Sequence, residues 1–417
     1  MVARLSSLVL VLLSSAFAAG CGGDDDAADG DADADSDSDA DSDADSDTDA
    51  DSDADSDGDA DGDADGDADR EPFMPPLDEI DPDWWTELRP AGDTNCSRGS
   101  EFAFFVRPGA VNRLVLDFIG GGACWNAATC SVADAIFNPD VENVRDAVRT
   151  GNPHGIYDRD DERNPVRDWT HVVIPYCTGD VHWGDAVVTY GEGADEVTIN
   201  HKGAVNVRAV LGWVYENIQA PEHVLVTGCS AGSYGSVLWS AQVMQHYPDA
   251  LVTQLGDSGA GIITETFFEE SFPSWNAEQA FPAFIPELDP AQVDLTGKTL
   301  ADLYSGIGNY FPDQRISQYN TAFDENQVFY FQAMGGGDAA DWSERMFASI
   351  AQIHDTTASF ASFIPSGEQH CILLFDNFYT VNVGGRLLTD WLAALIDRQP
   401  VERLACTECS EPTPGSE

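Results

Sequence analysis

The chain has 417 residues, with 74 Asp or Glu against 19 Lys or Arg, so its formal net charge is -55. A protein this acidic lacks the basic surface that neutralises a phosphate backbone, which excludes nucleic acid as a partner. Residues 24–69 hold 24 Asp and no basic residue, whereas residues 70–417 hold 50 acidic and 18 basic residues. The later residues are rich in apolar side chains and can bury a large core, so we expect one elaborated domain over residues 72–417.

The N-terminus has the features of a secretory signal over residues 1–20. Arg4 precedes an apolar run from Leu5 to Phe17 that is shorter than the roughly 20 residues needed to span a bilayer, and small residues follow it. Cleavage after Gly20 would leave Cys21 first, and small residues before a cysteine resemble the bacterial lipoprotein signal. We therefore expect an extracytoplasmic lipoprotein of the cell envelope, anchored to the membrane by a lipid on Cys21, with plain secretion as the alternative.

Residues 21–71 form the predicted linker between anchor and body. From residue 24 to 69, Asp alternates with Ala, Ser, Thr or Gly, so the segment has no apolar side chain with which to fold and its charges repel one another. We expect a disordered stalk with a reach of at most roughly 150 Å. Asp57 to Gly62 matches the first half of a calcium-binding EF-hand loop, but the required Glu is replaced by Ala68 or Pro72, so only weak cation binding is expected.

The body reads as an α/β fold with a mostly parallel central sheet flanked by helices. Helices are predicted over residues 204–218 and about 385–397, where apolar residues recur at intervals of three and four. Residues 262–312 are rich in Phe, Pro and Trp, fit no regular unit, and are interpreted as a cap inserted over the sheet. Strands are predicted over residues 101–106, 113–119, 171–175, 223–227, 251–255 and 315–320.

A candidate nucleophile lies between the strand at 223–227 and a helical pattern that runs through Tyr247. There Gly228, Ser230 and Gly232 form G-x-S-x-G, the motif of a nucleophile elbow when it joins a strand to a helix. The turn is tight enough to require Gly at both positions, and it would present the Ser230 hydroxyl at the edge of the sheet. The N–H of Ala231, at the start of the helix, could then donate to a developing oxyanion.

A second oxyanion donor is expected from Gly120, Gly121 and Gly122, which follow the strand at 113–119. Three glycines leave backbone N–H groups free to face a ligand without obstruction by side chains. A phosphate-binding loop is the alternative, but neither G-x-x-x-x-G-K-[ST] nor G-x-G-x-x-G is present there.

Ser230 needs a histidine to take its proton and a carboxylate to orient that histidine, and in this type of fold both follow the serine in the chain. Of His246, His354 and His370, the first two lie in predicted helices and the third in a loop, so His370 is favoured as the base. Three residues remain open as the acid from the residues alone: Asp324 after the strand at 315–320, Asp338 if residues 328–333 form a strand, and Asp257 after the strand at 251–255.

Several blocks together resemble the pectin acetylesterase family of α/β-hydrolases, which includes the Notum carboxylesterases. They occur in the family's order over about residues 90–375 and comprise Gly120 to Asn126, Ile174 to Asp180, Gly228 to Gly232, Asp257 to Gly259, Tyr319 to Asp324 and His370 with Cys371. The resemblance implies Ser230 as nucleophile, Asp324 as acid and His370 as base. It also implies an oxyanion hole from Gly121, Gly122 and Ala231. Candidates for the substrate pocket are Trp125, Asp180 and Trp183.

Eight cysteines follow Cys21, and export permits disulfides between them. The resemblance suggests that Cys96 pairs with Cys177 and Cys124 with Cys130. Cys229, beside the nucleophile, is expected to be a buried free thiol. For Cys406 and Cys409, a metal site lacks a second pair nearby, so we expect a disulfide, with Cys371 as one possible partner.

The expected function is a serine carboxylesterase that removes short acyl groups, above all acetyl, from polysaccharide or a small ester. It would act as a monomer and use no metal or organic cofactor. A fatty-acyl ester of the Notum type is the alternative substrate. The alternative of another class is a surface lipoprotein that only binds, with the Asp-rich stalk as a cation-binding segment.

Overall fold

The computed structural model describes residues 71–132, 136–151, 154–270 and 272–409. The predicted signal, Cys21 and the Asp-rich stalk lie outside these residues, so those predictions stay predictions. Among the helices of the described residues, none combines the length and apolarity that crossing a bilayer requires.

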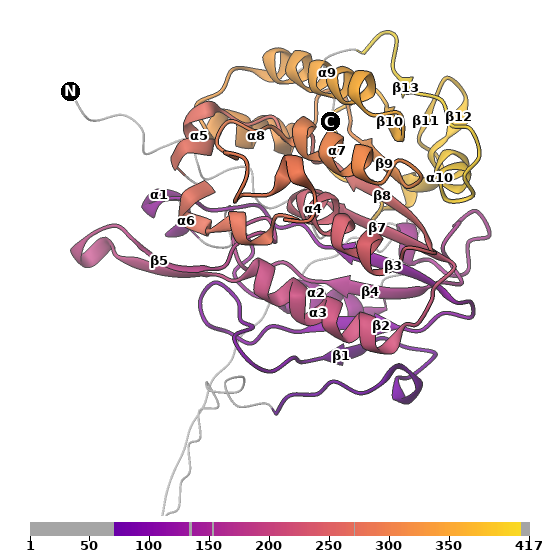
Figure 1. Ribbon diagram of the computed structural model, residues 1–417, viewed down its shortest axis with the longest axis horizontal. Coiled ribbons are helices and arrows are strands. Elements are labelled where there is room, and N and C mark those ends of the chain that lie inside the picture. Colours follow the sequence, from indigo (N-terminus) through magenta and orange to yellow (C-terminus); the bar gives the residue numbers. More distant parts are fainter. Residues whose placement is uncertain (1–70, 133–135, 152–153, 271, 410–417) are drawn as a thin grey trace, which may run out of the picture. The chain divides into compact units, whose positions relative to one another are not determined.

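A nine-stranded, mostly parallel sheet forms the centre of the body, in the order β1-β2-β4-β3-β7-β8-β9-β10-β13 (Figure 1). Within this sheet, only the pairs β1 with β2 and β2 with β4 are antiparallel. The strands β4, β3, β7, β8, β9, β10 and β13 therefore all run in one direction. The strands are β1 (Thr86–Leu88), β2 (Phe104–Arg107), β3 (Arg113–Phe118), β4 (Thr170–Ile174), β7 (His223–Cys229), β8 (Leu251–Asp257), β9 (Arg315–Tyr319), β10 (Phe360–Ile364) and β13 (Leu404–Ala405).

Side chains that alternate along these strands enter two separate hydrophobic clusters, one on each face of the sheet. On β7, Val224 and Val226 belong to the larger cluster and Leu225 to the smaller one. The larger cluster includes side chains of the helices α3 (Gly203–Asn217), α4 (Ala231–His246), α7 (Leu300–Tyr310) and α9 (Ala339–Thr356). The smaller cluster includes α10 (Leu388–Ile396). The sheet is therefore covered by helices on both faces, which confirms the predicted α/β-hydrolase-like fold.

All six predicted strands are present, with ends that differ by up to three residues. The predicted helix at 204–218 is α3, and its periodic apolar residues are buried. The helix predicted from Gly385 begins only at Leu388, because Gly384 and Gly385 have positive φ and turn the hairpin of β11 (Asn382–Val383) and β12 (Arg386–Leu387). Residues 328–333 were a conditional strand, and they lie in the helix α8 (Glu325–Ala333) instead.

Residues 262–312, which we name the cap, contain short irregular elements before α7, as their composition predicts. These are α5 (Glu265–Glu270), α6 (Phe272–Trp275), η4 (Ala277–Ala280) and η5 (Pro286–Leu288). The cap contacts the hairpin of β5 (Ala186–Tyr190) and β6 (Val197–His201), where the Tyr190 hydroxyl donates to Ser274 Oγ at 3.0 Å.

Four disulfides join the cysteines of the described residues. Cys96 pairs with Cys177 and Cys124 with Cys130, as the family resemblance suggested. The expectation of a free thiol at Cys229 is wrong, because Cys229 pairs with Cys371 across 142 residues. Cys371 is therefore not available to Cys406, which pairs with Cys409. This many disulfides indicates folding in an oxidising, extracytoplasmic compartment.

Candidate active site

Ser230 occupies the sharp turn between β7 and α4. Its φ of 57° and ψ of -123° lie outside the ordinary regions for an L-residue, a strain of about 1–3 kcal/mol that the surrounding structure must hold. Glycines allow the close approach: a Cβ on Gly232 would lie 1.8 Å from the carbonyl oxygen of Phe118, and one on Gly228 would lie 2.4 Å from that of Gly232. The motif therefore has the strand-turn-helix context of a nucleophile elbow.

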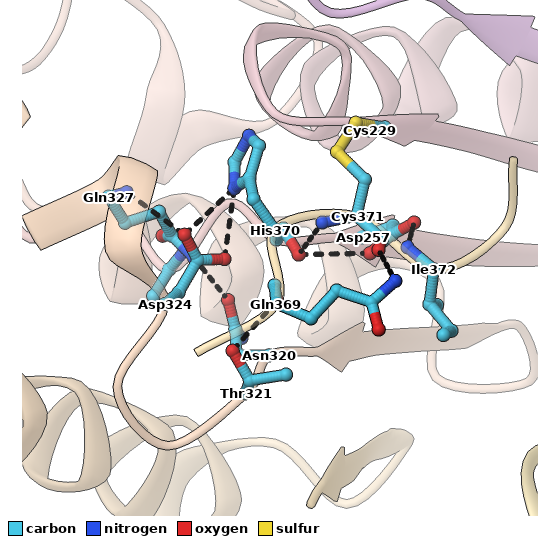
Figure 2. A network of polar contacts seen from close by, with 12 residues as sticks. Cys229, Asp257, Asn320, Thr321, Asp324, Gln327, Gln369, His370, Cys371 and Ile372 are labelled. Atoms are coloured by element: carbon cyan, nitrogen blue, oxygen red, sulfur yellow. Dashed lines mark hydrogen bonds and ion pairs between the residues drawn. A yellow bond between two sulfur atoms is a disulfide. The ribbon is translucent and has the colours of Figure 1, made fainter. Parts of the chain in front are cut away.

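His370 and Asp324 are hydrogen-bonded to each other, although 46 residues separate them. His370 Nδ1 lies 2.8 and 3.0 Å from the two carboxylate oxygens of Asp324, and Figure 2 shows the two side chains facing one another. An ionised carboxylate only accepts hydrogen bonds, so Nδ1 carries the proton and Nε2 is left with its lone pair. Ser230 and His370 line the same cavity.

Asp324 is completely buried, and further donors compensate the loss of water around its charge. It caps the N-terminus of α8 by accepting the backbone N–H of Gln327 at 2.9 Å. The side chain of Gln327 donates from Nε2 to Asp324 Oδ2 at 3.0 Å. The Oε1 atom of Gln327 accepts the N–H of Ala260 at 2.7 Å. Gln327 thus connects the carboxylate to the cavity wall.

The other candidates for acid and base have different partners. Asp338 is exposed and caps α9, where it accepts the N–H of Asp341. Asp257 is buried but accepts backbone N–H groups beyond His370 rather than its ring. His246 stacks on Tyr215 at the surface, and His354 bonds to Ser362. Among the described residues, Asp324 is the carboxylate bonded to the His370 ring.

Opposing influences set the pKa of His370, whose side chain is only 13 % exposed. Burial lowers the pKa, but the charge and hydrogen bond of Asp324, together with the charges of Asp257 and Glu325, outweigh it. The pKa therefore lies above its ordinary value. A proton accepted by Nε2 would be stabilised there, as a general base requires.

Two of the three predicted oxyanion residues, Gly122 and Ala231, line the cavity with Ser230. Gly122 has a φ of 73°, and a Cβ there would lie 1.9 Å from the carbonyl oxygen of Ile136, so only glycine fits. Gly121 is not among the lining residues, and its carbonyl oxygen instead accepts the N–H of Asn138 at 2.9 Å. Gly121 therefore lies behind the cavity wall, whereas Gly122 and Ala231 form part of it.

The cavity above Ser230 is partly open to solvent and has a mostly apolar lining. The cap supplies much of its lining, including Ile263, Phe272, Trp275, Phe281, Leu288 and Leu300. The indole N–H groups of Trp183 and Trp275 donate to the backbone oxygens of Tyr234 and Cys124, both at 3.0 Å. These donors are satisfied elsewhere, so the rings can present apolar surface to a ligand. No acidic side chain of the described residues lines this cavity.

The three pocket candidates lie at different depths. Trp183 lines the cavity. Trp125 does not line the cavity, but its ring packs edge-on against Phe267, which does line it. Asp180 is completely buried and stabilises a turn by accepting from Thr178, His182 and Gly203. It therefore has no exposed surface with which to contact a substrate.

The polar cavity residues that the sequence interpretation missed include Gln327 and Tyr330. The Tyr330 hydroxyl donates to the carbonyl oxygen of Ile136, beside the position that a Cβ on Gly122 would enter. Gln327 had a signal, because Asp324-x-x-Gln327 has the spacing of a helix N-terminal capping box. Tyr330 had none.

Within the part of the chain that the structure describes, two groups of side chains resemble metal sites in their spacing: Cys124 and Cys130 with His201, and Cys229 and Cys371 with His370. In each group the two cysteines form a disulfide, so neither offers the thiolates that bind a metal.

Residues 87–280 match the family described as Pectinacetylesterase, which confirms the resemblance found in the sequence. The match contains Ser230 and Asp257 and ends before Asp324 and His370. No curated protein sequence matches the chain.

Two crystal forms of the Wnt deacylase Notum from Drosophila have a similar structure. One has a TM-score of 0.57 at 16% identity and covers 78% of this chain and 96% of that one. The other has a TM-score of 0.56 at 17% identity and covers 80% of this chain and all of that one. At such identities the likeness concerns the fold.

Proposed function

We propose that this chain, whose residues 87–280 belong to the pectinacetylesterase family, is a carboxylesterase that acts through Ser230, His370 and Asp324. The family implies a carboxylesterase, and the bond from His370 Nδ1 to the buried Asp324 is the observation that carries this mechanism. Ser230 on the strained turn, with His370 on the same cavity, supplies the remaining parts.

In the proposed reaction, Ser230 Oγ attacks the ester carbonyl and His370 Nε2 takes its proton. The N–H groups of Gly122 and Ala231 stabilise the oxyanion, with Gly121 as the third expected residue. His370 then returns the proton to the leaving alcohol, and the acyl group stays on Ser230. Water, deprotonated by the same imidazole, releases the acid and restores the serine.

The acyl group that fits the cavity best is longer than acetyl. The cavity is lined by aromatic and aliphatic side chains such as Phe272, Phe281 and Leu288, and this apolar surface suits a chain of methylene groups better than the single methyl of an acetyl group. The proposed order of preference is therefore a medium or long acyl ester first, with the acetyl ester predicted from the family resemblance second. The two similar structures are of a protein named as a deacylase, which agrees with the removal of an acyl group.

A series of p-nitrophenyl esters from acetyl to decanoyl, assayed with purified protein, tests both parts. We expect hydrolysis that a Ser230→Ala variant lacks, with kcat/KM rising along the series. Equal rates for the two proteins would reject the mechanism and favour the binding lipoprotein. A maximum at acetyl would leave the mechanism standing and reverse the order of substrates.

The membrane anchor is a separate part of the proposal, since Cys21 lies outside the described residues. The small residues before Cys21 support it. A Cys21→Ser variant should leave the membrane fraction for the soluble one, whereas an unchanged distribution would rule out the lipid.

A further inference from the structure

We propose that Asp257 is a positioning residue that fixes where Ser230 and His370 lie relative to each other. This assignment rests on the proposed function. Asp257 is the last residue of β8 and is 0 % exposed. It does not line the cavity, so it acts through the backbone of its neighbours rather than on a substrate.

Asp257 is bonded to the backbone on both sides of the proposed reaction. Its main-chain oxygen accepts the N–H of Ser230 at 2.9 Å, which fixes the turn of the nucleophile. Its carboxylate oxygen Oδ2 accepts the N–H groups of Ile372 and Leu373 at 2.8 and 3.0 Å. One buried residue thus joins the serine turn to the chain immediately after His370.

Two further connections run alongside Asp257. The hydroxyl of Ser258 accepts the N–H of Cys371 at 2.8 Å and donates to Asp257 Oδ1 at 3.1 Å. The disulfide between Cys229 and Cys371 joins the residue before Ser230 to the residue after His370. Figure 2 shows this disulfide, Asp257 and Ile372 grouped on one side of His370, with Asp324 on the other.

The backbone around Asp257 is strained at three points. Ser230, Ser258 and Cys371 have φ values of 57°, 56° and 61°, and none of them is glycine. Such conformations persist where the surrounding bonds over-determine them, and they gather at functional sites. Each of these three residues is bonded either to Asp257 or to Ser258 next to it. The hydrogen bonds of Asp257 and Ser258 therefore hold the strained segments that carry Ser230 and His370.

The charge of the Asp257 carboxylate also raises the pKa of His370. Burial raises the pKa of Asp257 to about 6, opposed by its bonds from Ile372 and Leu373. The other charged groups that act on the His370 ring are Asp324 and Glu325. Removing the charge of Asp257 should therefore lower the pKa of His370 and move the acid limb of kcat/KM to lower pH.

The test compares Asp257→Asn and Asp257→Ala with Asp117→Asn in the full chain. Asp117 is the control because it is another buried carboxylate of the same sheet, bonded to the Tyr157 hydroxyl, and it is not among the charges that set the pKa of His370, although the charge of Asp257 raises its own pKa. Rates are expressed per active site titrated with a fluorophosphonate, so unfolded protein does not count. We expect Asp257→Ala to lower kcat about 10²-fold at little changed KM, the loss typical of a misplaced catalytic group.

Asp257→Asn keeps the size of the side chain and should show the shifted acid limb, which a purely structural role would not cause. If Asp257→Ala does not fold, the Asn variant decides alone. Normal kcat and an unmoved limb, beside an inactive Ser230→Ala variant, would overturn the positioning role only. An active Ser230→Ala variant would overturn the proposed function and this role together.

Discussion

The edge of the sheet and the cap meet at one cavity but are held together in different ways. The sheet edge, which we define as residues 228–232, 257–258, 320–324 and 370–373, is fixed by glycine contacts, buried hydrogen bonds and the disulfide of Cys229 with Cys371. The cap, residues 262–312, consists of short helices and turns, and its contribution to the cavity is mainly apolar, with Lys298 and Thr299 as its polar lining residues. Hydrogen bonds and disulfides fix position and direction, whereas apolar contacts are non-directional.

We therefore expect the sheet edge to hold the reactive groups of the proposed esterase and the cap to shape its acyl pocket. Reactive groups need geometry within tenths of an ångström, which directional bonds can supply. An acyl pocket needs volume and apolar surface, which side chains of many shapes can supply. Changes at the sheet edge should therefore alter turnover, and changes in the cap should alter the choice of ester.

The largest effect is expected from Ser230→Ala. Loss of the nucleophile should lower kcat by about 10⁶-fold, because the oxyanion hole and binding alone retain little catalysis. Stopped assays with the best ester of the series measure this loss, and circular dichroism checks the fold. A folded variant with more than a tenth of the wild-type rate would contradict the role of Ser230.

Asp324→Asn should follow, with kcat lower by about 10³-fold, because an amide no longer selects the Nδ1–H form of His370. The wild-type acid limb of kcat/KM should lie above the ordinary pKa of histidine, since the pKa of His370 is raised and the base must be neutral. Activity is then lost as the pH falls through that value. The residual activity of Asp324→Asn should have its acid limb of kcat/KM at lower pH than the wild type. An acid limb at the same pH would mean that Asp324 does not raise the pKa of His370.

In the cap, Ile263→Trp should change selectivity. Ile263 is half-buried and lines the cavity, so a larger ring there fills space meant for the acyl chain. We expect kcat/KM for decanoyl ester to fall about 10-fold or more while that for acetyl ester stays within about twofold. Val187→Trp, at a position 58% exposed on β5, is the matched control. Equal losses on both esters would mean that the cap also sets turnover.

Asp117→Asn should leave turnover unchanged and affect stability only. Burial raises the pKa of Asp117 to about 7, opposed by the bond from Tyr157 and reinforced by the charge of Asp257. A raised pKa in the folded state means that stability falls as the pH rises from about 4 towards 7, by an amount on the order of a few kcal/mol. Urea unfolding at pH 5 and pH 8 should show a smaller difference for the variant than for the wild type. An identical difference would exclude titration of Asp117 over this range.

Short-range features of the sheet edge could be predicted from the sequence. The nucleophile elbow needs only a strand, a turn with two glycines and a helix, all within residues 223–247, so local spacing was enough. The glycines at 120–122 were found in the same way. Residues 101–103 and the start of α10 were placed less well, because a strand or helix begins where hydrogen-bond partners are found rather than where apolar residues begin.

The sequence by itself determined the fold class, the family resemblance and the strand-turn-helix motif around Ser230, since each rests on motifs of residues that are neighbours in the chain. The residues alone left three aspartates open and the family resemblance implied Asp324; the tertiary structure shows that Asp324 is bonded to His370, that Cys229 pairs with Cys371, and that the cavity lining is apolar. Each of these depends on segments separated by 46 residues or more, or on how cap side chains fill space around a site formed by other segments. Such contacts form only when distant segments pack together, so the periodicity of the sequence does not predict them.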